Sequence, residues 1–284
     1  MTTTRSVFLA SVCFTMALTL VTLAGCSKPE DAPQGALAGR LVLTGSSTVA
    51  PLAAEIAKRF ESRHPAVRVD VQTGGSSRGV ADARRGTADI GMVSRALKPE
   101  EADLAAHTIA LDGISIILHR DNPIPALTDE QIVAIYTGRI TRWNEVGGRN
   151  ERITVVNKAE GHSTLELFLG HFKLKSEDIR ADIVIGDNQQ GIQTVAGDPH
   201  AIGYISIGTA AYESAHGTAI RTVPMAGVAP TLANVRNRRF PLSRPLNLVT
   251  RGDLSPLQKA FIAFATSSTV HDLVEVQYFV PLAD

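Results

Sequence analysis

Along residues 41–284, short apolar stretches alternate with longer amphipathic ones. Residues 67–71 alternate apolar and polar side chains, which is the period of a strand, whereas residues 52–60 repeat apolar side chains at helical spacing. Strands are predicted in this way at 41–43, 67–71, 88–93, 114–119, 153–156, 183–185, 202–205 and 246–249. Helices are predicted at 52–60, 79–85, 99–106, 165–172 and 255–264, and after the capping residue Thr128. The alternation indicates an α/β fold of mostly parallel sheets flanked by helices.

The folded part is long enough for two lobes. We place residues 40–117 plus 245–284 in one lobe and residues 118–244 in the other, so that the chain crosses twice between them. Ligands of open α/β sheets bind outside the carboxyl ends of the strands, and clefts between domains are common ligand sites. A ligand is therefore expected in the cleft between the lobes.

Several junctions between a strand and a helix are rich in hydroxyl groups. They occupy residues 44–51, 74–79 and 161–164. The first N–H groups of a helix lack intrahelical partners and the helix dipole adds positive charge, so these junctions suit a bound anion. Ser47 and Thr48 are candidates in the first junction, unless they only cap the helix. In the second, a glycine pair lets N–H groups converge beside Ser76 or Ser77, unless it only makes a tight turn.

The third junction combines hydroxyl groups with a cation. Ser163 and Thr164 supply the hydroxyls, and Lys158 lies just upstream. The lysine could neutralise an oxyanion as a point charge, although an exposed lysine is the commoner case. His162 could bind the ligand, line the cleft or face solvent. This junction therefore offers the widest range of chemistry and the most alternatives.

A further candidate pair, Ser94 and Arg95, directly follows a predicted strand. The planar fork of an arginine suits oxyanions because it can donate two parallel hydrogen bonds. Alternatively, Arg95 anchors a neighbouring carboxylate, either Asp89 or Asp112. The sequence leaves both roles open.

The first residues of the chain have the layout of a secretory signal. A basic residue precedes the apolar run 7–23, which ends in Leu23-Ala24-Gly25-Cys26, similar to a bacterial lipobox. We therefore predict a signal peptide at 1–25, lipidation of Cys26 and a flexible tether at 26–39. An uncleaved membrane anchor is the alternative, since the run approaches the roughly 17–25 residues that span a bilayer. Either arrangement places the folded part outside the cytoplasm.

Composition excludes several functional classes. Cys13 and Cys26 are the only cysteines, so the mature domain has no disulfide and no cysteine nucleophile. The 28 basic residues balance 28 acidic ones, and the one basic cluster, residues 236–239, is interpreted as a solvated loop rather than a nucleic-acid site. No metal-ligand motif, P-loop or Gly-x-Ser-x-Gly elbow is present, so no metal or cofactor is expected.

Five motifs in fixed order resemble a known family over nearly the whole mature chain. The chain resembles the periplasmic phosphate-binding proteins of ABC importers, which are type II periplasmic binding proteins with two α/β lobes that close on phosphate. The motifs are Thr44-Gly45-Ser46-Ser47-Thr48-Val49-Ala50-Pro51, Gly74-Gly75-Ser76-Ser77-Arg78-Gly79, Ala88-Asp89-Ile90-Gly91-Met92-Val93-Ser94-Arg95, Tyr136-Thr137-Gly138-Arg139-Ile140-Thr141-Arg142-Trp143-Asn144 and Arg244-Pro245-Leu246.

The resemblance implies a role for each residue of the first lobe. Ser47 and Thr48, with the N–H of Val49, would hold the anion at the first helix. Ser77, and less directly Ser76, would donate from the glycine turn. These roles come from the family pattern and not from spacing.

The chain departs from the family at two places. Ser94 stands where some members have an aspartate that accepts a hydrogen bond from protonated phosphate, and Arg95 is implied as a charge partner. Family members often have Arg-x-x-Gly-Ser-Gly-Thr where this chain has residues 158–165. Its lysine keeps the positive charge without the arginine fork, while Ser163 and Thr164 keep hydroxyl and N–H donors.

The resulting prediction is a lipid-anchored, monomeric binding protein on the periplasmic or cell-surface side of a bacterial membrane. It would capture phosphate or a similar tetrahedral oxyanion by lobe closure and dock to ABC permease subunits, without cofactor, metal, nucleic acid or catalysis. One alternative is a sensor or interaction lipoprotein of the same fold that binds another oxyanion or a protein. The other is an extracytoplasmic hydrolase of phosphate esters, since a Ser/His/Asp triad is not excluded by composition.

Overall fold

The computed structural model describes residues 37–283, which belong to one compact α/β unit. The predicted signal peptide, the lipidation residue Cys26 and most of the predicted tether lie outside the described residues. The end of the tether is described, and there β1 begins at Gly39, inside the predicted tether. No helix within residues 37–283 combines the length and apolar character that a bilayer crossing requires.

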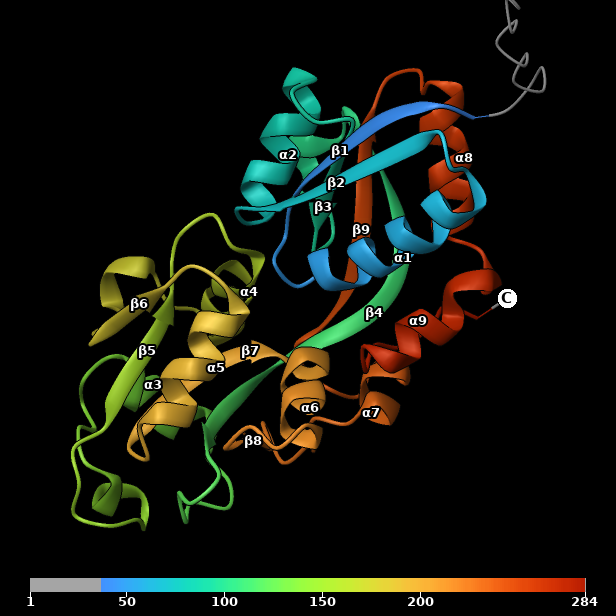
Figure 1. The fold of residues 1–284 in the computed structure, drawn as a ribbon. Helices are drawn as coiled ribbons and strands as arrows, with labels where there is room; N and C mark the ends of the chain where they lie inside the picture. The colour runs from blue at the N-terminus through green and yellow to red at the C-terminus, as the bar shows by residue number, and fades with distance from the viewer. Residues whose placement is uncertain (1–36, 284) are drawn as a thin grey trace, which may run out of the picture. The chain divides into compact units, whose positions relative to one another are not determined.

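The described strands form one sheet in the spatial order β2-β1-β3-β9-β4-β7-β5-β6, with β8 paired to β4 outside this path. Figure 1 shows β1, β2 and β3 gathered in one half of the molecule, β5, β6 and β7 in the other, and β4 and β9 running between them. The strand bounds are β1 (Gly39–Gly45), β2 (Val67–Thr73), β3 (Ile90–Val93), β4 (Leu104–His119), β5 (Thr154–Lys158), β6 (Ile183–Ile185), β7 (Ala201–Ser206), β8 (Ile220–Val223) and β9 (Ser243–Arg251).

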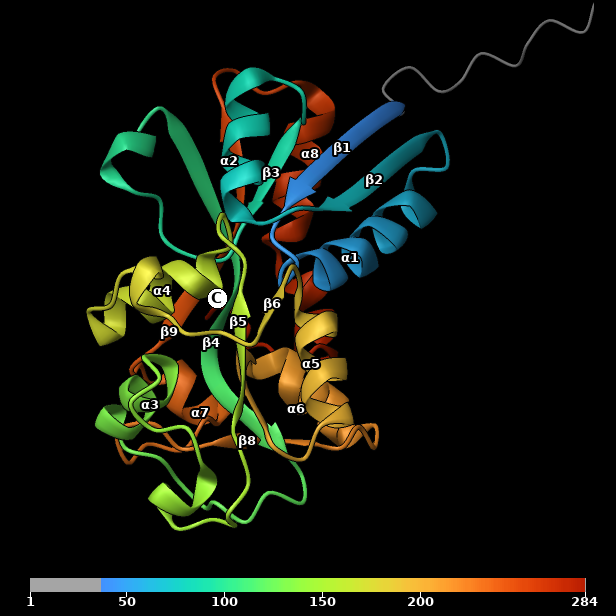
Figure 2. The same ribbon diagram turned by 90° about the vertical axis from the view of Figure 1, so that its left-hand side faces the viewer.

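The sheet is mixed, because its outer parts are parallel and its centre is antiparallel. β1 pairs in parallel with β2 and β3, and β5 pairs in parallel with β6 and β7. Every antiparallel pair of the described sheet involves β4 or β9, which run in opposite directions beside each other. The expected α/β class is confirmed, and the expected parallel pairing holds only away from the two long strands (Figure 2).

Helices cover both halves of the sheet. Thr128 caps α3 through a capping box with Gln131, as predicted, and Ser255 caps α8 in the same way. The helix bounds are α1 (Ala50–Arg63), α2 (Ser76–Arg85), α3 (Asp129–Tyr136), α4 (Ser163–Phe172), α5 (Asn188–Gly197), α6 (Ile207–Ala215), α7 (Leu232–Arg236), α8 (Pro256–Ala265) and α9 (His271–Val276). Short 3-10 turns lie at Pro99–Glu101, Trp143–Val146, Ser176–Asp178 and Ser268–Val270.

The apolar side chains of the described residues form separate clusters, and the two largest contain different parts of β4. One large cluster contains Leu43, Phe60 and Phe261, from β1, α1 and α8. The other contains Tyr136 and Phe168, from α3 and α4. Separate cores are consistent with two lobes, but the predicted assignment of 40–117 plus 245–284 and of 118–244 stays a prediction.

The predicted helix at 99–106 is wrong. The structure has only one 3-10 turn at Pro99–Glu101, and β4 begins at Leu104. Leu104 pairs with Arg251 of β9 in an antiparallel ladder that continues to Gly113. Pairing with β9 therefore overrides the local helix preference of this alanine- and glutamate-rich segment.

Candidate anion-binding site

Three helices begin beside one small cavity. They are α1, α2 and α4, and in none of them does the side chain of the N-cap residue accept a backbone hydrogen bond. By contrast, α3, α5, α6, α7 and α8 each begin with a Ser, Thr or Asp side chain that accepts a backbone hydrogen bond. An uncapped N-terminus leaves N–H donors and the positive end of the dipole free. The starts of α2 and α4 therefore bring N–H donors to one place, whereas at the start of α1 Ser46 Oγ already accepts from the N–H groups of Thr48 and Val49.

The cavity has a volume of about 10 Å³, close to the minimum for one water molecule. Its first wall comprises residues 46–49, 75–77 and Ser94, and its second wall comprises residues 161–164, with Lys158 and Asn188 behind them. Most of the lining side chains are buried. The lining residues are Ser46, Ser47, Thr48, Gly75, Ser76, Ser94, His162, Ser163 and Thr164.

The two walls touch at Gly75. The N–H of Ser77 donates to the carbonyl of Gly161 over 3.0 Å. A Cβ atom at Gly75 would lie 2.6 Å from that same carbonyl oxygen, and the residue has a φ of 89°. Only glycine combines this φ with such a close approach at little cost. The glycine pair therefore lets the walls meet.

The first wall is held together by its own hydroxyl groups. Ser46 Oγ accepts hydrogen bonds from the N–H groups of Thr48 and Val49, over 3.2 and 3.4 Å, and donates to Ser94 Oγ over 2.9 Å. Ser76 Oγ accepts from the N–H of Ser94 over 3.2 Å. The wall is thus fixed before any ligand contacts it. Ser46 was not among the predicted site residues.

A buried arginine on β9 connects the two walls. The guanidinium of Arg244 donates to Thr48 Oγ1 over 3.2 Å, to Ser94 Oγ over 3.3 Å and to Thr164 Oγ1 over 3.1 Å. It also forms an ion pair with Asp112 on β4 over 2.9 Å, with both side chains 1% exposed. Burial lowers the pKa of Arg244, while the charge of Asp112 opposes this, so the arginine stays charged.

The arginine determines which way two hydroxyl groups point. A hydroxyl has two lone pairs and one hydrogen. Thr48 Oγ1 accepts from Arg244 and, over 3.1 Å, from Asn188 Nδ2. Ser94 Oγ accepts from Ser46 and from Arg244. Because both lone pairs of each oxygen are filled, Thr48 and Ser94 can act only as donors towards a ligand.

The second wall contains polar atoms that nothing in the described residues satisfies. Both ring nitrogens of His162 and the hydroxyl of Ser163 are buried without a hydrogen-bond partner. Burial, together with the charge of Lys158, lowers the pKa of His162 to about 4, so its ring is neutral at neutral pH. An unsatisfied buried polar atom costs about 1–3 kcal/mol. These groups are therefore poised to bind a polar ligand.

Lys158 lies behind the second wall and does not line the cavity. The side chain is almost fully buried, and its amine donates to Asn188 Oδ1 over 3.3 Å. Burial lowers the pKa of Lys158 to about 7; Asp187 opposes the shift and Arg244 adds to it. No carboxylate of residues 37–283 lies within ion-pair distance of this amine. The lysine therefore reaches the cavity only through Asn188.

The structure does not bring Arg95 to the cavity. Its buried guanidinium binds Glu101 over 2.6 Å and Glu166 over 3.0 Å. The predicted alternative partner, Asp112, instead pairs with Arg244. Two carboxylates close to one arginine leave little of its charge for an anion, so Arg95 is a structural residue here.

Ser77 is also turned away from the cavity. Its hydroxyl donates to Glu166 over 3.1 Å, whereas Ser76 is buried and lines the cavity. Successive residues of a helix point about 100° apart, so only one of the two can face the ligand. The side chain of Val49 packs in the core, and only its N–H lies near the site. Ser47 and Thr164 line the cavity as expected from their positions.

Ser46, Asn188, Asp112 and Arg244 were missed by the sequence analysis as site residues. The sequence contained an indication of a role for Arg244, because it is a charged residue at the start of an apolar strand. Another apolar segment contains an aspartate, and the structure places the two opposite each other. The roles of Ser46, Asn188 and Asp112 depend on which side chains meet in space, and no local sequence pattern reveals that.

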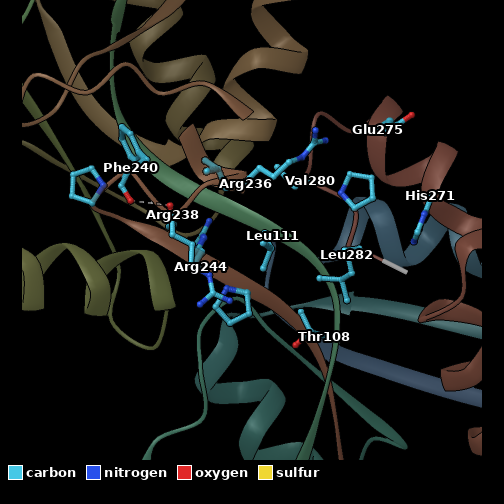
Figure 3. A pocket seen from close by; sticks show the side chains of 16 residues that line it. Thr108, Leu111, Arg236, Arg238, Phe240, Arg244, His271, Glu275, Val280 and Leu282 are labelled. Atoms are coloured by element: carbon cyan, nitrogen blue, oxygen red, sulfur yellow. Dashed lines mark hydrogen bonds between the residues drawn. The ribbon is translucent and has the colours of Figure 1, made fainter. Parts of the chain in front are cut away.

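A much larger cavity lies elsewhere, along β4, β9 and α9. It has a volume of about 1020 Å³ and apolar side chains such as Leu111, Val280 and Leu282, with Arg236 and Glu275 among its charged groups (Figure 3). Its lining hydroxyls, those of Thr108 and Ser243, already donate to protein acceptors. Arg236, Arg238 and Arg244 also line it, so it carries positive charge, but only the small cavity has the starts of α1, α2 and α4 beside it within residues 37–283.

Within residues 37–283, no group of three or more His, Cys, Asp or Glu residues is arranged to hold a metal ion. The donor set at the small cavity consists of hydroxyl and N–H groups with an arginine, which suits an oxyanion better than a cation.

Comparisons with known proteins agree with this chemistry. A family model described as a PBP superfamily domain matches residues 30–269. The phosphate-binding protein PstS of Borreliella burgdorferi is 32% identical over 247 residues, which cover 83% of this chain and 87% of the relative. The chain belongs to the PstS family of phosphate-binding proteins. This family consists of solute-binding proteins, and its fold is the type II periplasmic binding fold.

Solved structures of PstS-like proteins have the same fold. A Clostridium perfringens protein assigned as a phosphate ABC transporter substrate-binding protein, solved with bound phosphate, has a TM-score of 0.80 and 33% identity. It covers 86% of this chain and is itself covered completely. An ABC-type phosphate transport receptor of Vibrio cholerae has a TM-score of 0.70 and 30% identity, covering 85% of this chain and 100% of the receptor. The family resemblance predicted from the five motifs is confirmed.

Proposed function

We propose that this protein captures inorganic phosphate outside the cytoplasm and delivers it to an ABC importer. The observation that carries the proposal is the pair of hydroxyls, Thr48 and Ser94, whose lone pairs are filled by protein donors. They can only donate, and they line a cavity beside which α1, α2 and α4 begin. A surface made of donors is complementary to an oxyanion. The membership of the chain in the PstS family supports phosphate as that anion.

Binding would exchange the water shell of the anion for donors from both walls. The present cavity is far smaller than a tetrahedral oxyanion, so the walls must separate to admit the ligand and close on it. We propose that the predicted lobes, 40–117 plus 245–284 and 118–244, carry out this movement. Arg244 would neutralise the anion at the centre, with Ser163 and His162 completing the second wall.

The remaining features of the proposal concern context. The protein would act as a monomeric carrier without catalysis, anchored through lipidated Cys26 on the periplasmic or cell-surface side and docking to permease subunits. The carrier role follows the family of the chain, which consists of solute-binding proteins.

Isothermal titration of the full-length protein with phosphate, arsenate, sulfate and molybdate tests the proposal. We expect phosphate binding, and we expect Thr48→Val to weaken it about 10- to 100-fold, because the variant loses a charge-assisted donor. Thr73→Val, at an exposed position on β2, is the matched control and should bind like the wild type. Absence of phosphate binding in the wild type contradicts the proposal.

A second candidate is a sensor or interaction lipoprotein of the same fold. It is favoured by the second wall, where Lys158 and His162 give a different donor set from the family pattern described above. Phosphate uptake by cells that lack this protein separates the two: unchanged uptake favours the sensor, and reduced uptake favours transport.

A further inference from the structure

Phosphate and sulfate have the same shape and differ in their hydrogens. At neutral pH, phosphate carries at least one hydrogen on its oxygens and sulfate carries none. A site that distinguishes them needs a group that accepts this hydrogen, because a buried donor without a partner is costly. The question is which atom of the cavity can accept.

The hydroxyl groups of the cavity are poor candidates. Thr48 and Ser94 have no free lone pair, as described above. A hydroxyl with a free lone pair can accept from the ligand only by turning its own hydrogen elsewhere, for example to another oxygen of the same anion, so it is not a fixed acceptor. Within residues 37–283, the hydroxyls of Ser76, Ser163 and Thr164 donate to no protein acceptor, so each is free to donate to the ligand. Ser47 likewise makes no side-chain hydrogen bond to another described residue.

No carboxylate lines the cavity either. Asp112 accepts from Arg244 and from the N–H of Gly208. Asp187 caps α5 by accepting from the N–H of Gln190. Each of these carboxylates is therefore committed to protein donors.

His162 is the one lining side chain with an acceptor atom that carries no hydrogen of its own and no protein donor within residues 37–283. Its ring carries the donor and the acceptor on separate nitrogens, and both nitrogens are buried without a partner. We propose that His162 accepts the hydrogen of a protonated tetrahedral oxyanion, so that the site prefers phosphate and arsenate to sulfate and molybdate. This inference rests on the proposed function and names the residue that determines its specificity.

The surroundings of His162 keep the ring neutral, as this role requires. The amine of Lys158 and burial both disfavour a second proton on the ring, while the carboxylates of Asp187 and Glu166 favour it. Burial and the lysine dominate, because the pKa of His162 is lowered to about 4. A lone pair is thus available throughout the neutral pH range.

Gly75 sets the place of the ring. A Cβ atom at Gly75 would lie 2.6 Å from His162 Nδ1, so the ring is packed directly against the glycine turn of the first wall. In this position a change of rotamer is restricted by the opposite wall. His162 therefore lines the cavity with its ring confined between the two walls.

The test measures affinities of the full-length protein for phosphate and sulfate at neutral pH. We expect the wild type to prefer phosphate, and His162→Ala to reduce the ratio of the two affinities about 10- to 100-fold. His162→Gln, whose amide oxygen can accept, should retain most of the preference. Ser163→Ala is the matched control, because loss of a donor should weaken both anions alike and leave the ratio unchanged.

The other outcomes are equally informative. If the wild type binds phosphate but His162→Ala weakens both anions equally, His162 is not the specificity residue, whereas the proposed function stands. The same holds if the wild type binds both anions equally well. If the wild type binds neither anion, both the proposed function and this inference are overturned.

Discussion

The two walls of the cavity differ in how their polar atoms are satisfied. In the first wall, Ser46, Ser76 and Ser94 form hydrogen bonds with one another and with backbone N–H groups. In the second wall, His162 and Ser163 keep buried atoms without partners. The first wall is therefore built by the fold, and the second is completed only by a ligand.

Because of this difference, the first wall should contribute mainly to the stability of the protein and the second wall mainly to its affinity for the anion. Residues of the first wall stabilise the protein whether or not an anion is bound. The unpaired atoms of the second wall destabilise the ligand-free protein. Binding of the anion removes this cost because it gives these atoms hydrogen-bond partners. Arg244 belongs to both walls, since it donates to Thr48 and Ser94 on one side and to Thr164 on the other. Variants at each place should separate the two quantities.

The largest effect is expected for Arg244→Met, which removes the link between the walls. Asp112 would remain buried without its partner, and breaking such a pair lowers the free energy of unfolding by about 3–5 kcal/mol. Phosphate binding should be lost as well. Urea denaturation and isothermal titration measure the two effects.

A double variant separates the charge of the pair from its contact with the ligand. Arg244→Met with Asp112→Leu removes both charges, so stability should largely recover while phosphate binding stays absent. Retained phosphate binding in either variant would show that Arg244 does not hold the anion.

An intermediate effect is expected from two serine variants, one in each wall. Ser46→Ala leaves the N–H groups of Thr48 and Val49 without an acceptor and should lower the free energy of unfolding by about 1–3 kcal/mol. Ser163→Ala removes an unpaired buried hydroxyl, so it should raise the stability of the ligand-free protein by about 1 kcal/mol and weaken phosphate binding. Thermal unfolding with and without phosphate tests both, and equal destabilisation by the two variants would contradict the comparison.

The smallest effect is expected for Glu166→Gln. Together with Lys98 and Ser77, Glu166 forms a partly exposed group of side chains, which we call the rim. Glu166 binds Lys98 over 2.9 Å and Arg95 over 3.0 Å, and accepts from Ser77. Burial opposes its ionisation, but the hydrogen bond to Lys98 and the charge of Arg95 outweigh it and lower the pKa of Glu166. Loss of this partly exposed pair should cost at most about 1 kcal/mol.

The pH dependence of this rim contact follows from the lowered pKa. Glu166 stabilises the folded state above the usual pKa of a glutamate, and this contribution is lost as pH falls through its lowered pKa. The difference in unfolding free energy between wild type and Glu166→Gln should therefore be present at neutral pH and vanish in acid. A difference that persists in acid would assign the effect to packing instead of charge.

Much of the fold followed from the apolar pattern, because local periodicity reports strands and helices that are buried on one side. The predicted strands at 67–71 and 183–185 correspond to β2 and β6, and the helix at 165–172 lies within α4. The segment 99–106 failed because a long-range ladder with β9 decides its structure. Pairing between distant strands leaves little trace in local composition.

The candidate site could be predicted only in part for a similar reason. Hydroxyl-rich junctions were visible as local motifs, and the structure brings Thr48, Ser76 and Ser163 to one cavity. Which of two neighbouring residues faces the cavity depends on the helix phase, as Ser76 and Ser77 illustrate. Arg95 and Arg244 look equivalent in sequence, and only the positions of Glu101 and Asp112 separate them.

The contact between the walls at Gly75 has a kinetic consequence. A bound anion can leave only when the walls separate, and the hydrogen bond from the N–H of Ser77 to the carbonyl of Gly161 holds the walls together. Its residence time is then set by how often this contact and the rim around Glu166 break, and not by the strength of the anion's own hydrogen bonds alone. A substitution at Gly75 should therefore shorten residence, even though glycine contributes no side chain to the ligand.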